Sequence, residues 1–221
     1  MEPVPRPRVK ICCIASVEEA RLAIKYGASA LGLVSQMPSG PGVIPEEAIS
    51  RIASEVPPPI GTFLLTSQQD AQAIIAQQRR CRTNTIQICD RLRDGSYHDL
   101  KSALPGISIV QVVHVVGPES VEEAIALATQ VDAILLDSGN PALAVKELGG
   151  TGRRHNWDLS RKIREAIDIP LFLAGGLNAD NVRQAIAEVA PFAMDICSGV
   201  RTEGKLDERK LAEFMANAVA S

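Results

Sequence analysis

Short runs of apolar and β-branched residues recur along this chain, and no other feature of the sequence constrains its fold as strongly. Eight such runs begin about 26 residues apart, a little less than the roughly 30 residues of a strand–helix–strand unit. The runs are continuously apolar, which is typical of strands that are buried on both faces of a parallel sheet. The predicted strands span residues 9–15, 30–35, 60–66, 85–89, 108–115, 133–138, 170–176 and 193–199.

Helix signals fill the intervals between these strands. Ser16 is the expected N-cap of the first helix, with Glu19 completing a capping box, and Pro45 stands at the first position of the next helix. Amphipathic patterns mark three later helices. The predicted helices span residues 17–26, 45–56, 118–131, 178–189 and 207–219.

No linker or shift in composition divides the chain, so residues 1–221 are expected to form one domain. Eight strand–helix units in one domain predict an α/β fold, a single-domain (β/α)8 or TIM barrel. An open, doubly wound parallel sheet is the alternative fold. Residues 1–8 are rich in proline and are expected to form a flexible N-terminal extension.

Composition and charge exclude several classes of function. Hydrophobic residues make up 46% of the chain and charged residues 22%, which is typical of a folded globular protein. A net charge of −3 does not attract a polyanion, and 3% aromatic residues offer little for bases to stack on, so nucleic acid is not an expected partner. No apolar run approaches the roughly 18 residues of a membrane span. We therefore expect no membrane partner and a cytoplasmic protein.

The five cysteines form no recognisable framework. Cys12, Cys13, Cys81, Cys89 and Cys197 are odd in number and contain no Cys-x-x-Cys pair. Neither a disulfide scaffold nor a zinc site follows from this spacing. We therefore expect no metal site.

Glycine-rich turns follow the last three predicted strands. The active site of a (β/α)8 barrel lies at the carboxyl ends of the strands, and phosphate is often bound after strands seven and eight. Gly175-Gly176 and Ser198-Gly199 stand at those two places, where bare backbone N–H groups approach an anion closely. A third turn, residues 149–152, lies in a long connection over residues 139–156, a length expected for an active-site lid. These turns predict a phosphate site.

Several motifs, in chain order, carry a resemblance to one family. They are Val9-Lys10-Ile11-Cys12, Leu135-Leu136-Asp137-Ser138, Gly149-Gly150-Thr151-Gly152, Asn156-Trp157, the segment from Leu173 to Val182, and Asp195-Ile196-Cys197-Ser198-Gly199-Val200. They resemble the motifs of phosphoribosylanthranilate isomerase, an enzyme of tryptophan biosynthesis. The resemblance covers essentially the whole chain and is more specific in its second half.

The resemblance implies an isomerase that needs no cofactor. The implied reaction is the Amadori rearrangement of N-(5-phosphoribosyl)anthranilate to 1-(2-carboxyphenylamino)-1-deoxyribulose 5-phosphate. That reaction requires an acid to open the ribose ring and a base to remove the C2′ proton. The family's base falls on Cys12 and its acid on Asp137. The substrate- and phosphate-binding residues implied by the motifs and turns are Gly150, Thr151, Gly152, Gly175, Gly176, Asp195, Ser198 and Gly199.

Both catalytic assignments have a purely structural alternative. Cys12 could be a small buried hydrophobe, the commonest fate of a free cysteine, and Asp137 could be a helix cap or a loop carboxylate. A thiolate at Cys12 requires a positive neighbour, and Lys10 lies two residues away on the same face of the strand. An acid at Asp137 requires desolvation, which keeps a carboxyl group protonated near neutral pH.

The sequence departs from the family at the end that would hold the anthranilate ring. The family's first turn reads Cys-Gly, whereas this chain has Cys12-Cys13. The family's fourth-strand motif Gln-Leu-His-Gly is replaced by Gln87-Ile88-Cys89-Asp90. The second loop, residues 35–43, contains neither lysine nor the arginine that binds the anthranilate carboxylate in the family.

Three functions remain open on the sequence. The first is an authentic phosphoribosylanthranilate isomerase in which another basic group, such as Arg91 or Arg154, lies near the carboxylate. The second is a paralogous isomerase that acts on another phosphosugar amine. The third is a non-catalytic phosphosugar-binding barrel, against which the retention of Cys12 and Asp137 argues. In each case the partner is a small phosphosugar, and the chain is expected to be a monomer or a homodimer.

Overall fold

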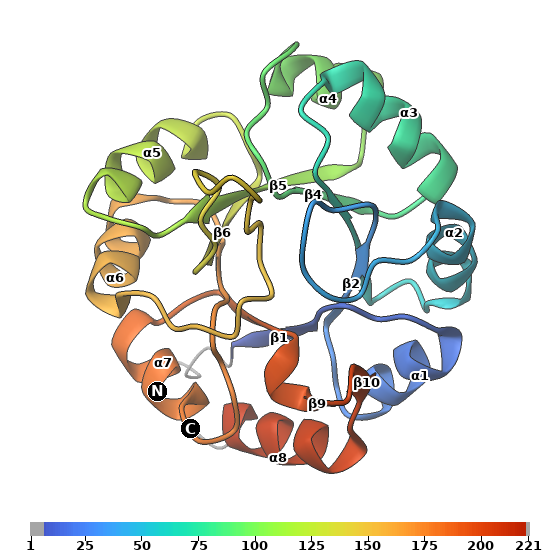
Figure 1. Cartoon of the computed structure of the whole chain (residues 1–221), viewed down its shortest axis with the longest axis vertical. Helices are drawn as coiled ribbons and strands as arrows, with labels where there is room; N and C mark the ends of the chain where they lie inside the picture. Colours follow the sequence, from blue (N-terminus) through green and yellow to red (C-terminus); the bar gives the residue numbers. More distant parts are fainter. Residues whose placement is uncertain (1–6, 220–221) are drawn as a thin grey trace.

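Eight parallel strands close into a barrel in the computed structural model, which describes residues 7–219 (Figure 1). Each strand pairs with the next along the chain, and β8 pairs with β1 to complete the ring. The strands are β1 (Arg8–Ile11), β2 (Ala30–Val34), β3 (Gly61–Thr66), β4 (Thr85–Ile88), β5 (Ser108–His114), β6 (Ala133–Asp137), β7 (Leu171–Leu173) and β8 (Ala193–Ile196). The predicted (β/α)8 barrel is confirmed, and the open sheet is wrong.

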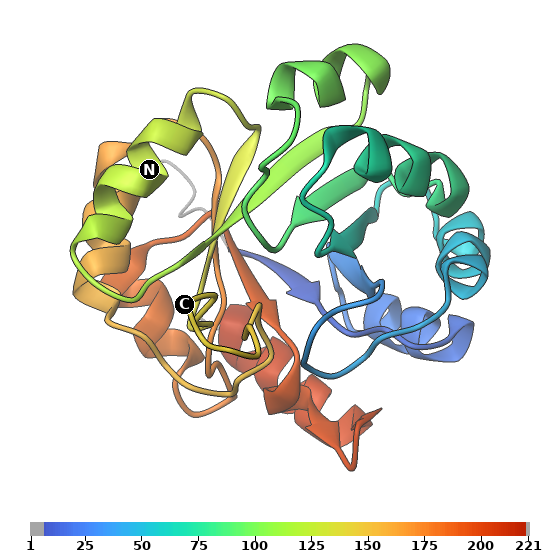
Figure 2. The same ribbon diagram turned by 45° about the horizontal axis from the view of Figure 1, so that its top comes forward.

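Helices alternate with the strands and form the outer ring of the barrel (Figure 1). They are α1 (Val17–Lys25), α2 (Glu46–Glu55), α3 (Ala71–Cys81), α4 (Tyr97–Ala103), α5 (Glu119–Ala128), α6 (Trp157–Ala166), α7 (Val182–Val189) and α8 (Glu208–Val219). After β8 the chain forms a short 3-10 helix, η1 (Ser198–Val200). It then forms a hairpin of β9 (Arg201–Thr202) and β10 (Lys205–Leu206), which projects from the barrel in Figure 2.

The strands contribute to two apolar layers, because successive side chains of a strand point to opposite sides. On β2, Leu31 and Leu33 belong to the larger core, which includes helix residues such as Ile52. Ala30 and Val34 of the same strand belong to the smaller cluster. Every residue of β2 is therefore buried, as its continuous apolar run predicted.

A buried ion pair joins two neighbouring strands of the barrel. Lys10 of β1 is fully buried, and its Nζ lies 2.9 Å from Oδ1 of Asp195 on the neighbouring β8. The ammonium group also lies 5.2 Å from the ring centroid of Phe63. Phe63 packs edge-on against Phe172, with centroids 5.7 Å apart. A buried charge requires a partner of opposite sign, so this pair fixes both side chains beneath the end of the barrel.

Several strands end earlier than predicted, because the chain turns into loops while its side chains stay buried. β1 ends at Ile11 rather than at residue 15, and Cys13 has a left-handed backbone with φ of 62°. A strand does not accommodate that conformation. β7 ends at Leu173, and β8 ends at Ile196 just before η1. The apolar runs overestimated the strands because burial continues past the last ladder residue.

The amino end of the barrel differs from the prediction in two details. Arg8 belongs to β1 and pairs with Ala193, so the predicted extension over residues 1–8 is wrong at its last residue, and residues 1–6 lie outside the described part of the chain. Ser16 caps α1 by accepting the Glu19 N–H at 3.2 Å. The Glu19 carboxylate accepts the N–H of Ala15, not that of Ser16, so the predicted capping box is only half formed.

Among the helices within residues 7–219, none combines the length and the apolar character needed to cross a membrane.

Candidate active site

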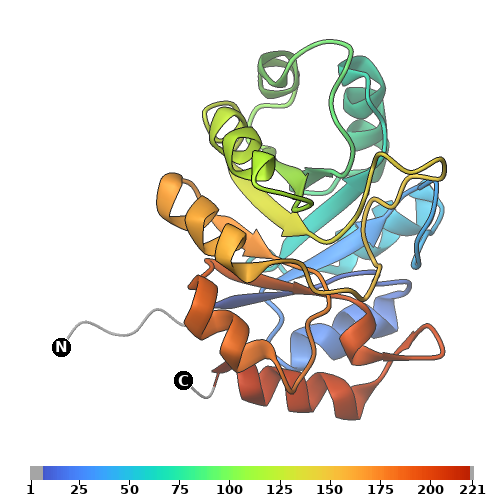
Figure 3. The same ribbon diagram turned by 60° about the vertical axis from the view of Figure 1, so that its left-hand side comes forward.

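A pocket opens at the carboxyl ends of the strands. The loops after β2 and β6 lie close together at this end of the barrel (Figure 3). Ser39 of the first loop donates its hydroxyl hydrogen to the Lys146 carbonyl of the second at 2.7 Å. A Cβ atom on Gly150 would lie 2.6 Å from Pro41 Cδ, so the two loops are packed against each other. The long connection after β6 therefore covers the pocket, as the lid prediction expects.

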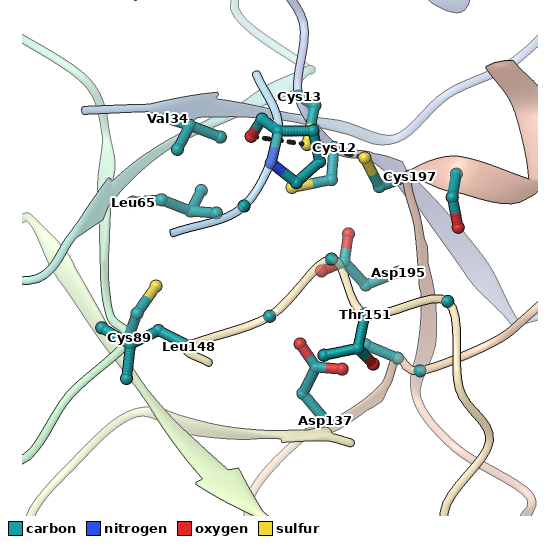
Figure 4. Close-up of a pocket in the computed structure, with 18 of the residues that line it drawn as sticks. Cys12, Cys13, Val34, Leu65, Cys89, Asp137, Leu148, Thr151, Asp195 and Cys197 are labelled. Carbon is teal, nitrogen blue, oxygen red and sulfur yellow. Dashed lines mark hydrogen bonds between the residues drawn. The ribbon is translucent and has the colours of Figure 1, made fainter. Parts of the chain in front are cut away.

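The pocket brings together nearly all of the predicted site residues. Those that line it are Cys12, Asp137, Gly150, Thr151, Gly152, Gly175, Gly176, Asp195 and Ser198. Gly199 follows Ser198 in the same turn, and an added Cβ there would collide with the Leu177 carbonyl oxygen. Figure 4 shows Cys12 and Asp137 on opposite sides of the pocket, with Asp195 between them.

Asp137 is the last residue of β6, and its side chain is buried. Oδ1 accepts the backbone N–H of Ser138 at 2.7 Å. A Cβ atom on Gly149 would lie 2.7 Å from Oδ2, so a bare residue is needed there to admit the carboxyl group. Burial raises the pKa of Asp137 above its ordinary value, although the Ser138 N–H opposes the shift. The structure thus supplies the desolvation that an acid at this position requires.

Cys12 directly follows β1 and is also buried. Its N–H donates to the Ile196 carbonyl at 2.8 Å, which fixes the residue against the end of β8. A Cβ on Gly32 would lie 2.8 Å from Cys12 Sγ and 3.2 Å from Lys10 Nζ, so thiol and ammonium group face the same bare backbone. Burial opposes the charge on Lys10, but the Asp195 carboxylate outweighs it and raises the pKa of Lys10. The thiol therefore lies beside a permanent positive charge.

The glycine turns after β7 and β8 present bare backbone to the pocket. Within residues 7–219, no hydrogen bond occupies the N–H groups of Gly175, Gly176, Ser198 or Gly199. Gly176 has a left-handed φ of 65°, and a Cβ there would lie 2.7 Å from the Arg154 backbone nitrogen. Glycine is thus required by packing of the lid, and its bare backbone stays open to the pocket. Unpaired N–H groups at such a turn form an anion-binding concavity.

Arg201 is a site residue that sequence reasoning missed. Its guanidinium is buried and donates to the Cys12 carbonyl at 3.3 Å and to the Cys13 carbonyl. Glu19 holds the same guanidinium through contacts of 3.0 and 3.1 Å. Arg201 of β9 thereby fixes the turn that carries Cys12. The left-handed φ of Cys13 also explains why glycine follows the cysteine in the resembling family.

Three sulfur atoms gather at the pocket wall beside this turn (Figure 4). Sγ of Cys13 lies 2.7 Å from Sγ of Cys197, which follows β8, and the two thiols share a hydrogen bond. The Cys13 thiol also donates to the Pro41 carbonyl at 3.7 Å. Hydrogen bonds to Cys12 and Cys197 raise the pKa of Cys13, and the bond to Cys13 lowers the pKa of Cys197.

The basic residues expected near the anthranilate ring lie elsewhere. Arg91 pairs with Glu123 at 2.9 Å, and the Arg154 guanidinium lies 4.3 Å from the ring centroid of Trp157. Trp157 itself is buried in the core. Arg91 and Arg154 do not line the pocket, so this structure gives no support to either of them as the replacement for the missing arginine.

No group of three or more histidine, cysteine, aspartate or glutamate side chains within residues 7–219 is arranged to hold a metal ion.

The fold and the pocket together define a (β/α)8-barrel protein with a buried carboxyl group, a thiol and glycine turns at the carboxyl ends of its strands. Residues 9–217 match the family model of N-(5'phosphoribosyl)anthranilate (PRA) isomerase. The chain belongs to this family.

Relatives and solved structures agree with the family match. The chain is 34% identical to N-(5'-phosphoribosyl)anthranilate isomerase 2 of Methanosarcina mazei, over 96% of this chain and 93% of that protein. The crystal structure of phosphoribosyl anthranilate isomerase from Thermotoga maritima superposes with a TM-score of 0.81 at 30% identity, covering 97% of this chain and all of that one. A phosphoribosyl anthranilate isomerase in complex with reduced 1-(o-carboxyphenylamino)-1-deoxyribulose 5-phosphate gives a TM-score of 0.78 at 28% identity, with the same coverage.

Proposed function

We infer that this chain isomerises N-(5'-phosphoribosyl)anthranilate by an Amadori rearrangement, a step of tryptophan biosynthesis. Its family and its full-length relatives support this function. The observation that carries it is the placement of Cys12 and Asp137 on opposite sides of one covered pocket. A sugar held between them exposes one face to each group.

The phosphate is proposed to bind at the turns after β7 and β8. The N–H groups of Gly175, Gly176, Ser198 and Gly199 are the donors available there, and residues 150–152 of the lid approach from the side. Thr151 is already tethered, because its hydroxyl lies 2.7 Å from that of Ser138. In this proposal the ribose lies between the two catalytic side chains, and the aryl group extends towards β2, β3 and β4.

Asp137 is proposed to act first, as the general acid. Its Oδ2 gives a proton to the ribose ring oxygen, the bond between that oxygen and C1′ breaks, and the nitrogen lone pair forms a Schiff base with C1′. Burial supports this role because it favours the protonated carboxyl group. The Ser138 N–H holds Oδ1 and leaves Oδ2 directed towards the pocket.

Cys12 is proposed to act second, as the general base. Its thiolate takes the C2′ proton, and the electron pair moves to form an enolamine. The Asp137 carboxylate then takes the O2′ proton of the enolamine while the Cys12 thiol gives its proton to C1′, which yields the ketone and restores both side chains. The neighbouring Lys10 charge stabilises a negative thiolate by Coulomb attraction in this buried setting.

Assembly and compartment are also part of the proposal. A monomer or a homodimer is proposed for the assembly. The five cysteines are free thiols, which suits the reducing cytoplasm.

Direct turnover tests the function. Purified protein is mixed with phosphoribosylanthranilate, and the loss of substrate fluorescence is followed in the absence of added metal or cofactor. We expect turnover with kcat within the usual range of about 1 to 10³ per second. A folded protein that leaves the fluorescence unchanged would exclude the proposed function.

A further inference from the structure

The aryl half of the pocket has no charge to meet a carboxylate. Val34, Leu65, Cys89 and Leu148 form this side, opposite the glycine turns (Figure 4). No lysine or arginine within residues 7–219 lines the pocket wall. Anthranilate carries a carboxylate on its ring, and burying it without a cationic partner is costly. If the proposed substrate is correct, a cation outside the present wall has to reach it.

Lys146 is the cation best placed to do so. It lies two residues before Leu148, and Glu147 between them forms an antiparallel bridge with Asn140. Leu148 lines the pocket together with Cys89, so the lid segment that carries Lys146 lies over the end of β4. The ammonium group of Lys146 pairs with Asp90, the residue that follows Cys89. It therefore lies at the rim of the aryl half.

The pairing with Asp90 leaves Lys146 able to bind a second carboxylate. An ammonium group has three donors, and Asp90 is the one side chain that accepts from it within residues 7–219. The Lys146 side chain keeps 30% of its surface exposed, whereas Asp90 keeps 7%. The buried carboxylate thus anchors the ammonium group while its other hydrogens remain accessible.

We propose that Lys146 binds the carboxylate of the anthranilate ring and thereby determines substrate specificity. This inference rests on the proposed function. It places the aryl subsite beside the salt bridge between Lys146 of the lid and Asp90 at the end of β4. The lid thus brings the cation to the substrate when it covers the pocket. The contact is a charge-assisted hydrogen bond, which is stronger than a neutral one.

Lys146→Met tests the proposal, with Lys162→Met on the exposed face of α6 as the matched control. We expect Lys146→Met to raise KM for phosphoribosylanthranilate at least about tenfold, with kcat within about threefold of wild type. KM for N-(5-phosphoribosyl)aniline, which lacks the carboxylate, should stay unchanged. Equal effects on the two substrates, or no effect on either, would overturn the proposal. Wild-type protein without turnover would instead refute the proposed function.

A double variant separates loss of the cation from exposure of Asp90. Lys146→Met leaves that carboxylate unpaired, and its charge alone would repel the substrate. Lys146→Met/Asp90→Asn removes the repulsion. KM that stays at least about fivefold above wild type supports direct binding by Lys146, and KM that returns to wild type overturns it.

An independent observation concerns the adjacent thiols of Cys13 and Cys197. Their sulfur atoms are 2.7 Å apart, and a disulfide needs about 2.05 Å, so little movement separates the two states. Both residues line the pocket. Cys197 is the more exposed of the two, so an oxidant entering the pocket meets it first. We infer that these two residues form an oxidisable pair.

The reaction with a small-molecule disulfide such as oxidised glutathione is balanced. The Cys197 thiolate attacks one sulfur and expels one glutathione thiolate, and Cys13 then loses its proton, attacks Cys197 and expels the second. Two protein thiols are oxidised, and one disulfide is reduced to two thiols. The product is a Cys13–Cys197 bond that leaves Cys12 free.

Peptide mapping of the full-length protein after incubation with oxidised glutathione tests this inference. We expect a Cys13–Cys197 crosslink that dithiothreitol reverses, and Cys12 still open to alkylation. Cys13→Ser and Cys197→Ser should each prevent the crosslink, whereas Cys81→Ser, at a buried cysteine of α3, should not. A crosslink that includes Cys12, or none at all, would overturn it.

Discussion

The two halves of the pocket are built from different parts of the chain. The half at β7 and β8 consists of backbone: the N–H groups of Gly175, Gly176, Ser198 and Gly199 have no partner within the described residues. The half at β2, β3 and β4 consists of apolar side chains under two loops that contact each other. Each half suits one end of a phosphosugar amine.

The difference between the two halves indicates where substrate specificity can change without loss of the fold. At the phosphate half, an added side chain on Gly176 or Gly199 would collide with backbone, so the residue type is set by packing. At the aryl half, Lys146 and Asp90 meet only through side chains, and other pairs of residues fit the same backbone. The proposed phosphate contacts are thus tied to the barrel, whereas the proposed contacts with the ring are tied to the loops.

The largest effect is expected between the two halves, at the proposed acid and base. Cys12→Ala and Asp137→Asn should each lower kcat by at least about 10²-fold, the usual contribution of a general acid or base. KM should change by less than about threefold, since other residues hold both ends of the substrate. Steady-state kinetics with phosphoribosylanthranilate measures both values. Near-normal kcat in either folded variant would show that its role is assigned wrongly.

A second prediction concerns a substitution in the phosphate half. Gly176→Ala should raise KM at least about tenfold and weaken competitive inhibition by inorganic phosphate, because its Cβ displaces the lid backbone at Arg154. Gly106→Ala is the control, since Gly106 also has a left-handed φ, of 84°, but no atom within 4 Å of an added Cβ. Both variants carry the same left-handed strain of roughly 1 to 2 kcal/mol.

Unchanged phosphate inhibition in Gly176→Ala would remove the phosphate site from this turn. Thermal midpoints are measured alongside, and similar decreases in the two variants would assign the change in KM to the lid rather than to unfolding. The change in KM then reports on the phosphate half of the pocket and not on the stability of the fold.

The barrel and the bare backbone after β7 and β8 were predictable because their signals are local. Eight apolar runs predicted eight strands, and a glycine turn after each of the last two predicted backbone open to an anion. Cys12 and Asp137 were placed by motifs of the resembling family, and the structure adds the burial and the neighbouring Lys10 charge that their proposed roles need.

The aryl half was not predictable because its signals are not local. Arg91 and Arg154 were expected near the carboxylate, but Arg91 pairs with Glu123 of α5 and Arg154 stacks on Trp157 of α6. The contact of Lys146 with Asp90 joins residues 56 positions apart, and that of Arg201 with Cys13 joins residues 188 apart. Nothing in a single sequence indicates which long side chains meet across loops.

A third, smaller prediction concerns pH. Because burial raises the pKa of Asp137, kcat should fall as pH rises through that value and deprotonates the acid. Stability should also fall as pH rises. The native state binds the Asp137 proton more tightly than the unfolded chain does, so the contribution of Asp137 to the free energy of unfolding is full at low pH and is lost as pH rises through the folded-state pKa.

Asp137→Asn cannot ionise, so it should be more stable than wild type at neutral pH and no more stable below the ordinary carboxyl pKa. Each kcal/mol gained corresponds to about 2 to 4 °C in the thermal midpoint of a chain of this size. Asp168→Asn, at an exposed position, is the control and should shift nothing at either pH. A midpoint difference that does not depend on pH would contradict burial as the cause.

The smallest effect is expected from adding a cation to the aryl half. Pro41 lines the pocket and packs on Gly150, and its carbonyl accepts the Cys13 thiol, a contact that any residue at this position retains. Pro41→Arg should lower KM for phosphoribosylanthranilate by about threefold to tenfold through a charge-assisted hydrogen bond to the ring carboxylate. Pro41→Met, of similar length without charge, should not lower it. Circular dichroism and the thermal midpoint establish that the loop survives the loss of proline. If a folded Pro41→Arg variant shows the KM of Pro41→Met, the ring carboxylate does not lie on this side of the pocket, and the assignment of the two halves is reversed.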